Sequence, residues 1–254
     1  MTTYEQGMLI AGRNLVRVVR SPEVLASTLA VPLVLYIIFL VAFAKTILPG
    51  QGYSDYANFA LPGLAAFVIS FALPRSGSAI QRDLRDGILD RLRALPIGRS
   101  AVLFGRVGAD ATAIGIQIVL LSVVGFLFGA RFHGGLPGLV IYLLAPVGMG
   151  AVLCLFTIPL ALRAKSPEEV GGTLQLILLP LGFLSGGIVP IDALPGWLEP
   201  IARVNPLTCM VTAMRAAQEG DSTVGSVVPA LLWIVLGGAF ATALAARTYS
   251  RLDI

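Results

Sequence analysis

The fold is decided by the stretch from Leu139 to Leu160, which reads LVIYLLAPVGMGAVLCLFTIPL and contains no charged residue. At about 1.5 Å per residue, a helix of this length matches the hydrocarbon core of a bilayer, which is about 30 Å thick. Its apolar residues lack the alternation with polar ones that a barrel strand needs. The stretch therefore predicts a helix that crosses a membrane.

The composition of the whole chain agrees with this prediction. Of the 254 residues, 56% are hydrophobic and 13% are charged, whereas an ordinary soluble domain carries about 25% charged residues. So little polar surface cannot cover a water-soluble globule, and a chain this apolar does not stay disordered. We therefore expect an all-α integral membrane protein.

Five further stretches are similarly long and apolar. Because only helices and closed barrels satisfy the backbone within lipid, we expect six transmembrane helices in a single domain over residues 1–254. They cover residues 24–44, 56–74, 108–130, 138–162, 170–191 and 222–246. Residues 1–23 carry an apolar face opposite an arginine face, which is typical of a helix lying in the membrane interface. A simple basic topology anchor explains residues 1–23 equally well.

The positions of the lysines and arginines indicate which way the helices run. Six spans put both termini on one side of the membrane. If that side is cytoplasmic, 14 of the 18 Lys and Arg residues lie on it. Since short cytoplasmic loops collect positive charge, we expect cytoplasmic termini and a bacterial inner-membrane location. The net charge of +4 then reflects topology rather than nucleic-acid binding.

The sequence contains no candidate residues for metal binding, for nucleophilic catalysis or for ATP binding through a phosphate loop. One histidine and two cysteines, Cys154 and Cys209, give no metal cluster and no catalytic residue, and no GxxxxGK[ST] phosphate loop is present. We expect both cysteines to be small apolar fillers. The ionisable residue nearest to the middle of a span is Asp110, at the cytoplasmic end of the third expected span, where we expect it either to snorkel to the interface or to pair with Arg106 four residues earlier. A proton-driven carrier is therefore disfavoured. Neutral hydroxyls within the spans should bond to backbone carbonyls.

The longest inner segment joins the second and third expected spans. Ile88, Leu89, Leu92 and Leu95 form an apolar stripe there, and Pro96 ends the helix. This pattern predicts a short amphipathic helix that faces the cytoplasm and needs a partner surface. The alternative is a solvated connector whose leucines pack beneath the bundle.

The segment before the last span cannot form one long helix. It contains the helix-breaking residues Pro190, Pro195, Gly196 and Pro206. Trp197 suits a membrane interface. We expect short re-entrant helices in the outer leaflet over residues 192–221, and the alternative is an irregular loop with an aromatic anchor.

Both segments resemble the signature of the ABC-2 type transporter permeases, in the style of the daunorubicin-resistance exporters. The inner block reads QRDLRDG at 81–87, ILDRLRALP at 88–96 and IGRSAVLFGR at 97–106. The outer block reads SGGIVPIDALPGWLEPIARVNPLTCMVTAMRAAQEG at 185–220. Where the family usually has RE-x-GT, this chain has RDLRDG without a Thr after Gly87, which leaves the register of the acidic contact open.

The resemblance implies a coupling region at residues 81–98 that fits into a groove of a separate cytoplasmic ATPase. The implied coupling residues are Arg82, Asp83, Asp86, Gly87, Leu89, Arg91, Leu92, Leu95 and Pro96. Those of the outer re-entrant segment are Pro190, Pro195, Gly196, Trp197, Pro206 and Arg215. The resemblance also implies a second permease chain, and it assigns ATP and magnesium to the ATPase, with no cofactor in this chain.

The leading hypothesis is therefore an exporter permease without an ATPase site of its own. Neutral helix faces suit an amphipathic drug or a lipid-like compound, and only 8% of the residues are aromatic, mostly Phe, which disfavours a polysaccharide path. Two alternatives stay open: an exporter of glycolipid or polysaccharide, and a membrane scaffold whose cytoplasmic helix binds a partner. The paired inner and outer segments favour transport, because a scaffold has no need of the outer one.

Overall fold

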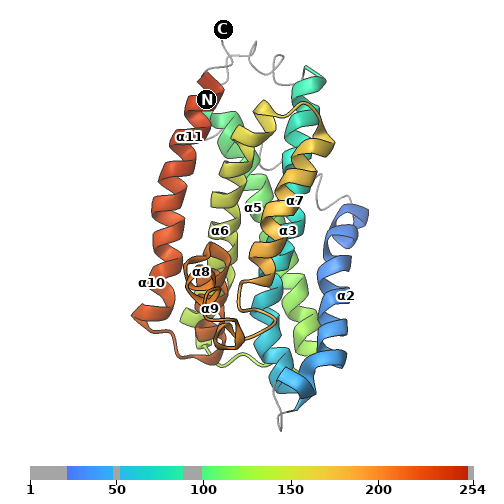
Figure 1. Ribbon diagram of the computed structural model, residues 1–254, viewed down its shortest axis with the longest axis vertical. Helices are drawn as coiled ribbons and strands as arrows, with labels where there is room; N and C mark the ends of the chain where they lie inside the picture. The colour runs from blue at the N-terminus through green and yellow to red at the C-terminus, as the bar shows by residue number, and fades with distance from the viewer. Residues whose placement is uncertain (1–21, 48–51, 88–98, 251–254) are drawn as a thin grey trace.

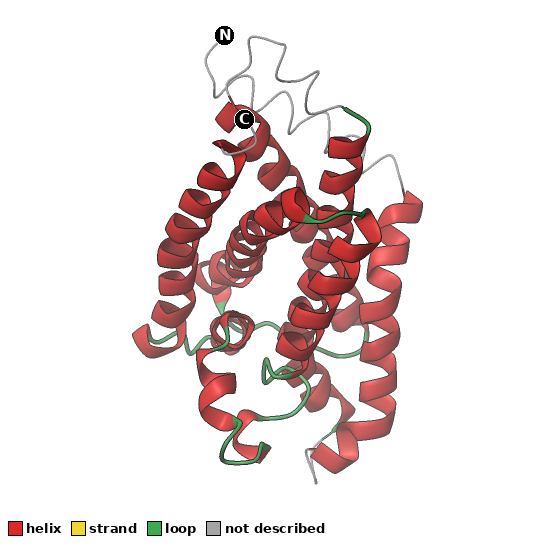
Figure 2. Cartoon of the chain, turned by 45° about the horizontal axis from the view of Figure 1, so that its top comes forward, coloured by secondary structure: helices red, strands yellow, loops and turns green. Residues whose placement is uncertain are grey.

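The computed structural model describes residues 22–47, 52–87 and 99–250, and every regular element within these ranges is a helix (Figure 1). The loops that join the helices are short by comparison (Figure 2). The helices are α2 (Pro22–Ile47), α3 (Tyr53–Arg85), α5 (Arg99–Leu127), α6 (Gly135–Arg163), α7 (Pro167–Phe183), η1 (Ile191–Ala193), α8 (Glu199–Val204), α9 (Pro206–Glu219), α10 (Val224–Leu232), η2 (Trp233–Gly237) and α11 (Gly238–Ser250). The π-helical turn η2 joins α10 and α11 into one continuous rod.

The long helices run alternately between the two ends of a bundle (Figure 1). We call the end at which α3, α6 and α11 finish the upper end, and the opposite end the lower end. The helices η1, α8 and α9 lie in the lower half, and we call them together the lower cap. The expected amphipathic helix from Ile88 to Leu95 lies outside the described residues, as does the expected interfacial helix up to residue 21.

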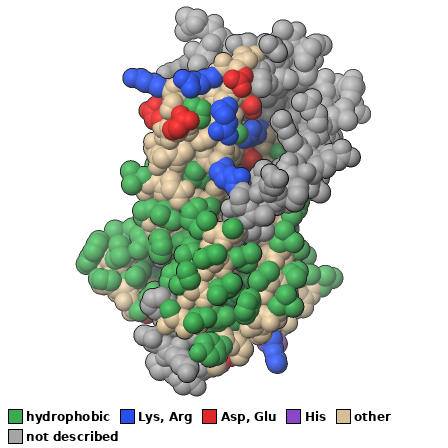
Figure 3. Space-filling view, turned by 90° about the vertical axis from the view of Figure 1, so that its right-hand side faces the viewer, with side chains coloured by type: hydrophobic (Ala, Val, Ile, Leu, Met, Phe, Trp, Pro, Cys, Tyr) green, Lys and Arg blue, Asp and Glu red, His purple; other side chains and the backbone are tan. Residues whose placement is uncertain are grey.

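Within residues 22–47, 52–87 and 99–250, four helices are long and apolar enough to cross a membrane, namely Tyr53–Arg85, Gly105–Leu127, Gly135–Arg163 and Val224–Ala245. The described apolar part of α2, Ala30–Ala42, is shorter, and α7 has 17 residues. On the face shown in Figure 3, hydrophobic side chains cover the lower and middle parts, and most charged side chains gather near the top. The prediction of an all-helical, multi-pass membrane protein is thus confirmed.

Three helix boundaries differ clearly from the expected spans. α5 begins at Arg99, nine residues before the expected start at residue 108. α3 continues beyond Pro74 to Arg85, because polar side chains on its last turns find partners on neighbouring helices. α7 ends at Phe183 and does not reach residue 191. Gly186 takes the left-handed region with φ 67°, so the chain turns there before η1 begins at Ile191.

The bundle is organised around α3, which packs against α2, α5, α6, α7 and α9. In the most apolar 18-residue stretch of α3, 78% of the residues are buried. In the corresponding stretch of the rod formed by α10, η2 and α11, only 11% are buried. The rod accordingly exposes large apolar side chains such as Leu236 and Phe240, each 64% exposed. We infer that the rod faces lipid and that α3 forms the core.

Buried hydroxyls within the helices bond to backbone carbonyls, as expected. Ser122 Oγ donates to the carbonyl of Ile118 at 2.7 Å. Ser70 Oγ lies 2.8 Å from the carbonyl of Ala66 in its own helix and 2.9 Å from that of Leu178 in α7. These hydroxyls are satisfied inside the bundle, so they do not require a polar ligand.

Gly63 is required by a close backbone contact between α3 and the turn after α7. A Cβ atom at Gly63 would lie 2.2 Å from the Cα of Gly187, so even alanine must push the two segments apart. We expect Gly63→Ala to cost about 1–3 kcal/mol or more and to lower the unfolding temperature. Because Cys154 and Cys209 are both buried, a thiol-reactive dye can report unfolding in detergent.

The matched control for this substitution is Gly172→Ala in α7. No atom lies within 4 Å of the Cβ that it adds, and alanine favours a helix over glycine by about 1 kcal/mol. We expect an unfolding temperature equal to or above that of the wild type. Equal unfolding temperatures for both variants would contradict the close contact at Gly63.

Candidate functional site

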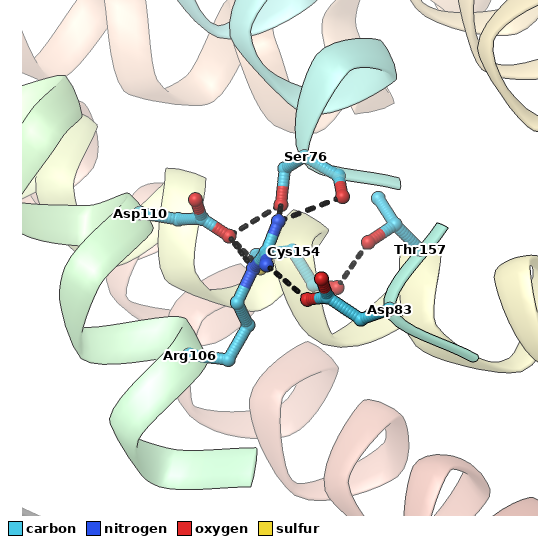
Figure 4. Close-up of polar contacts among 6 residues, drawn as sticks. All are labelled: Ser76, Asp83, Arg106, Asp110, Cys154 and Thr157. Atoms are coloured by element: carbon cyan, nitrogen blue, oxygen red, sulfur yellow. Dashed lines mark hydrogen bonds and ion pairs between the residues drawn. The ribbon is translucent and has the colours of Figure 1, made fainter. Parts of the chain in front are cut away.

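A polar cluster lies near the upper end of the bundle, where α3, α5 and α6 meet (Figure 4). We call it the upper cluster. It consists of Ser76 and Asp83 from α3, Arg106 and Asp110 from α5, and Cys154 and Thr157 from α6. Ser76 and Asp83 are seven residues apart, which is about two helical turns, so they share one face of α3.

The guanidinium of Arg106 is the centre of this cluster. Its Nε lies 3.3 Å from Asp110 Oδ2, and its Nη1 lies 3.4 Å from Asp83 Oδ2. Its Nη2 donates to the backbone carbonyl of Ser76 at 2.9 Å. The expected pairing of Arg106 with Asp110 is confirmed, and the same guanidinium also holds α3.

Asp110 receives two further hydrogen bonds. Ser76 Oγ donates to its Oδ2, and Cys154 Sγ donates to the same oxygen at 3.1 Å. Cys154 is buried, as expected for a small apolar filler. It also has a polar role that was not expected, because its thiol donates a hydrogen bond to a carboxylate. Thr157 Oγ1 donates to the carbonyl of Cys154 at 2.7 Å, which extends the cluster along α6.

The Arg106–Asp110 ion pair of the upper cluster is largely sheltered from water, whereas the side chain of Asp83 is 41% exposed. The side chains of Arg106 and Asp110 are 24% and 22% exposed. Charges in such a place are costly unless they are paired, so removing one partner weakens the bundle more than the loss of a surface ion pair does. The cluster therefore fixes α3, α5 and α6 to one another at this depth.

The upper cluster also lies close to both attachment points of residues 88–98. α3 leads into this segment from Arg85, and α5 leaves it at Arg99. Asp83 and Arg106 are thus on the two flanks of the segment, and their side chains are paired. A displacement of residues 88–98 must act on two helices that are joined to each other and to α6.

The structure places four of the implied coupling residues at the end of α3. Arg82 and Asp86 are exposed, and Asp83 turns toward Arg106. Asp86 N donates to the carbonyl of Arg82 at 2.9 Å, and Gly87 has φ 67°, which ends the helix with a left-handed residue. Leu89, Arg91, Leu92, Leu95 and Pro96 lie outside the described residues.

At the lower end, Asn205 and Thr208 attach α9 to the end of α7. Asn205 Oδ1 accepts from Leu207 N at 3.0 Å and caps the helix, with Pro206 in its first turn. Asn205 Nδ2 donates to the carbonyl of Leu181 at 2.8 Å, and Thr208 Oγ1 donates to that of Leu184 at 3.1 Å. Both side chains therefore fix where the lower cap begins.

Arg215 joins the lower cap to the start of α3. Its Nη2 lies 3.0 Å from the carbonyl of Phe59 and 3.0 Å from that of Gly186, and its guanidinium lies 4.0 Å above the Phe59 ring. Burial lowers the pKa of Arg215 to about 10, so it remains charged at neutral pH. The positive charge of Arg215 is therefore held by two backbone carbonyls and an aromatic ring within the protein.

The other implied residues of the outer segment lie on the rim of the lower cap. Pro190 precedes η1, and Pro195 accepts a backbone hydrogen bond from Leu198 at 2.8 Å in the turn that contains Gly196 and Trp197. Trp197 is 72% exposed. These residues share a surface with Arg203, which pairs with Asp192 and Glu199, and they do not contact the upper cluster.

The described ranges 22–47, 52–87 and 99–250 contain no group of three His, Cys, Asp or Glu side chains that could hold a metal ion.

The fold and the site together define the class of protein: a polytopic helical membrane protein with an ionic cluster at one end and a helical cap at the other. Residues 5–218 match the model of the family described as ABC-2 type transporter, and the chain belongs to this family.

Named relatives include drug-resistance permeases. The chain is 30% identical over 190 residues, or 73% of its length, to the daunorubicin resistance ABC transporter permease protein DrrB1 of Streptomyces coeruleorubidus, covering 66% of that protein. It is 27% identical over 154 residues, 61% of its length, to the probable doxorubicin resistance ABC transporter permease protein DrrC of Mycobacterium tuberculosis, covering 55% of it. It is 27% identical over 184 residues, 69% of its length, to the inner membrane transport permease YhhJ of Escherichia coli, covering 47% of it. The chain thus spans about half to two thirds of these relatives.

Proposed function

We propose that this chain is the membrane-spanning subunit of an ATP-binding cassette exporter. It moves an amphipathic drug or a lipid-like compound out across the cytoplasmic membrane, and a separate ATPase subunit supplies the energy. Membership of the ABC-2 type transporter family supports this function, as do the names of the drug-resistance relatives. The chain itself contains no GxxxxGK[ST] loop.

The observation that carries the proposal is the ionic link between the two flanks of residues 88–98. Asp83 of α3 and Arg106 of α5 are paired at 3.4 Å, so the helices on either side of the proposed coupling helix move together. Contact of this helix with a closing ATPase then shifts α3, the buried core of the bundle. A second permease chain completes the path, which alternates between inward-open and outward-open states.

We further propose six membrane crossings, made by α2, α3, α5, α6, α7 and the rod from α10 to α11. Consecutive members of this set run in alternating directions (Figure 1). The upper end is cytoplasmic in this arrangement, because it carries most of the Lys and Arg residues. Both termini are then cytoplasmic.

Cysteine labelling in intact cells tests the orientation. Ser54 is exposed at the lower end and Lys165 is exposed at the upper end, while the native Cys154 and Cys209 are buried. We expect a membrane-impermeant maleimide to label Ser54→Cys in intact cells and Lys165→Cys only after permeabilisation. The reverse pattern would overturn the proposed orientation.

Transport itself is tested with the proposed ATPase partner of this chain. The two subunits are co-purified and ATP hydrolysis is measured across a panel of drugs and lipids. We expect hydrolysis to rise with amphipathic compounds. A permease that never associates with an ATPase would favour the scaffold function over export.

A further inference from the structure

A pocket of about 330 Å³ lies at the lower end of the bundle, where the start of α3, the loop between α5 and α6 and the end of α9 meet. We call it the lower pocket. Its walls are formed by Asp55, Asn58 and Phe59 of α3, by Arg131 and His133 of the loop, and by Gln218 and Glu219 of α9. The ionisable residues among them are exposed, so the pocket opens to the surface.

The walls of the lower pocket are joined to one another by hydrogen bonds. Arg131 N donates to Asn58 Oδ1, and His133 N donates to the carbonyl of Gln218 at 2.8 Å. Gln218 Nε2 donates to Asn58 Oδ1 at 3.1 Å and to the carbonyl of Arg131 at 3.3 Å. Helix α3, the loop and helix α9 are therefore fixed around the pocket before a ligand binds.

Gln218 contributes a buried acceptor without a partner. The residue is 3% exposed, and its Nε2 is surrounded by three oxygen atoms of Asn58 and Arg131, so the amide cannot turn round without placing oxygen against oxygen. Its Oε1 has no hydrogen-bond partner among the described residues. An unpaired buried acceptor is costly, so the lower pocket favours a ligand that brings an N–H or O–H donor.

The lower pocket contains charges of both signs that do not neutralise one another. Within the part of the chain that the structure describes, neither Arg131 nor Glu219 takes part in an ion pair. Asp55 Oδ2 accepts from Gly52 N at 2.8 Å, which leaves the other carboxylate oxygen for a ligand. Arg215 attracts Glu219, but its Nη2 is held by two backbone carbonyls. A ligand with one cationic and one anionic group therefore finds a counter-charge for each.

The depth of the lower pocket matches the level of lipid head groups. Asp55 directly precedes the charge-free part of α3, and Arg131 directly follows the charge-free stretch 111–130. Such boundaries lie where the hydrocarbon core meets the head-group region. On either side of the loop, Leu127 is 81% and Leu136 is 75% exposed. A lipid finds apolar surface there for its chains, whereas a small soluble zwitterion uses the pocket alone.

We propose that the lower pocket binds the zwitterionic head group of a phospholipid that carries a primary ammonium beside its phosphate. The ammonium donates to Gln218 Oε1 and is balanced by the carboxylates of Asp55 and Glu219. The phosphate accepts from the guanidinium of Arg131, a group that binds phosphate oxygens in a bidentate manner. A bound lipid of this kind stabilises the junction of α3, the loop and α9. The inference goes beyond the proposed transport function and does not depend on it.

Equilibrium binding to the full-length chain without an ATPase tests the lower pocket directly. The probe is phosphatidylethanolamine with a fluorescent acyl chain in dodecyl maltoside micelles, followed by anisotropy. We expect Arg131→Gln and Glu219→Gln each to weaken binding by about tenfold, which corresponds to the loss of one charged hydrogen bond. Both residues are exposed, so the unfolding temperature without lipid should stay at the wild-type value.

Matched controls remove the same charges outside the lower pocket. Asp221 is exposed two residues after Glu219 and does not line the pocket, and Arg203 lies on the rim of the lower cap. We expect Asp221→Asn and Arg203→Gln to change probe binding by less than about twofold. Wild-type affinity in both pocket variants, or equal losses in the pocket variants and the controls, would overturn the assignment.

Two further lipids test which part of the head group each residue holds. Phosphatidylcholine has no N–H donor for Gln218 Oε1, so we expect it to bind about tenfold more weakly. Phosphatidylglycerol keeps the phosphate and lacks the ammonium. Arg131→Gln should therefore weaken its binding, whereas Glu219→Gln should not. Equal affinity for phosphatidylethanolamine and phosphatidylcholine, or a loss of phosphatidylglycerol binding in Glu219→Gln, would contradict the zwitterion site.

Competition distinguishes a lipid from a soluble zwitterion. We expect free phosphoethanolamine to compete only at about a hundredfold higher concentration than the lipid, because it lacks the apolar chains. Competition at equal concentrations would show that the ligand is not a lipid and overturn the assignment. None of these measurements uses an ATPase or a transported compound, so a negative outcome leaves the proposed function standing.

Discussion

Replacing Leu92 and Leu95 by Asp is expected to abolish co-purification of this chain with its ATPase and to abolish ATP-dependent export. Both leucines belong to the apolar stripe of the expected coupling helix. Burying one leucine side chain stabilises an interface by about 1.5–3 kcal/mol, and a carboxylate at the same position adds a desolvation cost of several kcal/mol. The loss of association should therefore be complete at micromolar concentrations.

The matched control for this experiment is Leu92→Met with Leu95→Met, which keeps the volume and apolarity of the stripe. We expect this variant to co-purify with the ATPase as the wild type does. Membrane insertion of all variants is checked by labelling Ser54→Cys from outside. Unchanged co-purification of the aspartate variant would contradict a role of residues 88–95 in binding the ATPase. It would favour the alternative, in which this segment is a solvated connector.

Removal of Arg106 is the second substitution with a large expected effect. Arg106→Ala leaves the sheltered carboxylate of Asp110, and the 41% exposed carboxylate of Asp83, without their guanidinium partner. Breaking a buried ion pair costs about 3–5 kcal/mol, and because Arg106 is 24% exposed we expect a value near or below the lower end. The thiol-dye assay should therefore show a clearly lower unfolding temperature. Substrate-stimulated ATP hydrolysis in the complex should fall while co-purification persists.

A double substitution separates the ionic link from a general loss of packing. Adding Asp110→Asn to Arg106→Ala removes one of the stranded charges, so we expect part of the lost stability to return. Arg85→Ala at the exposed end of α3 serves as a control and should change stability by less than about 0.5 kcal/mol. If the double variant is no more stable than Arg106→Ala alone, the charges of the upper cluster are not what joins the three helices.

The local features of the fold could be predicted from the sequence. The charge-free stretch from Leu139 to Leu160 lies within α6, and the spacing of Arg106 and Asp110 gave their pairing. Both follow from helical geometry within a single segment, where neighbours in space are three or four residues apart.

The long-range contacts could not be predicted in the same way. Asp83 meets Arg106 across the segment 88–98, and Arg215 reaches Phe59 across most of the chain. Periodicity within one helix reports which face is polar, and it does not report which other helix covers that face. For the same reason Cys154 was expected only to fill space, although its thiol donates to Asp110.

The open pocket between α3 and α7, lined by Arg75, Ser78 and Arg82 of α3 and by Gly171, Gly172 and Gln175 of α7, also depends on contacts between helices. The spacing of Arg75, Ser78 and Arg82 indicates one polar face of α3, which alone describes a solvated helix end. The small residues Gly171 and Gly172 turn this face into a pocket, because their missing side chains leave the wall of α7 open. Only the packing of α7 against α3 brings the two halves together.

Reconstitution of this chain with its ATPase in proteoliposomes tests the central claim most directly. The measurement is ATP-dependent movement of a labelled amphiphile across the bilayer, with each subunit omitted in turn. We expect movement only when both subunits and ATP are present, and we expect it to vanish in the Leu92→Asp, Leu95→Asp variant. Movement by this chain without the ATPase, or a complete absence of movement in a complex that hydrolyses ATP, would contradict an exporter permease driven through residues 88–98.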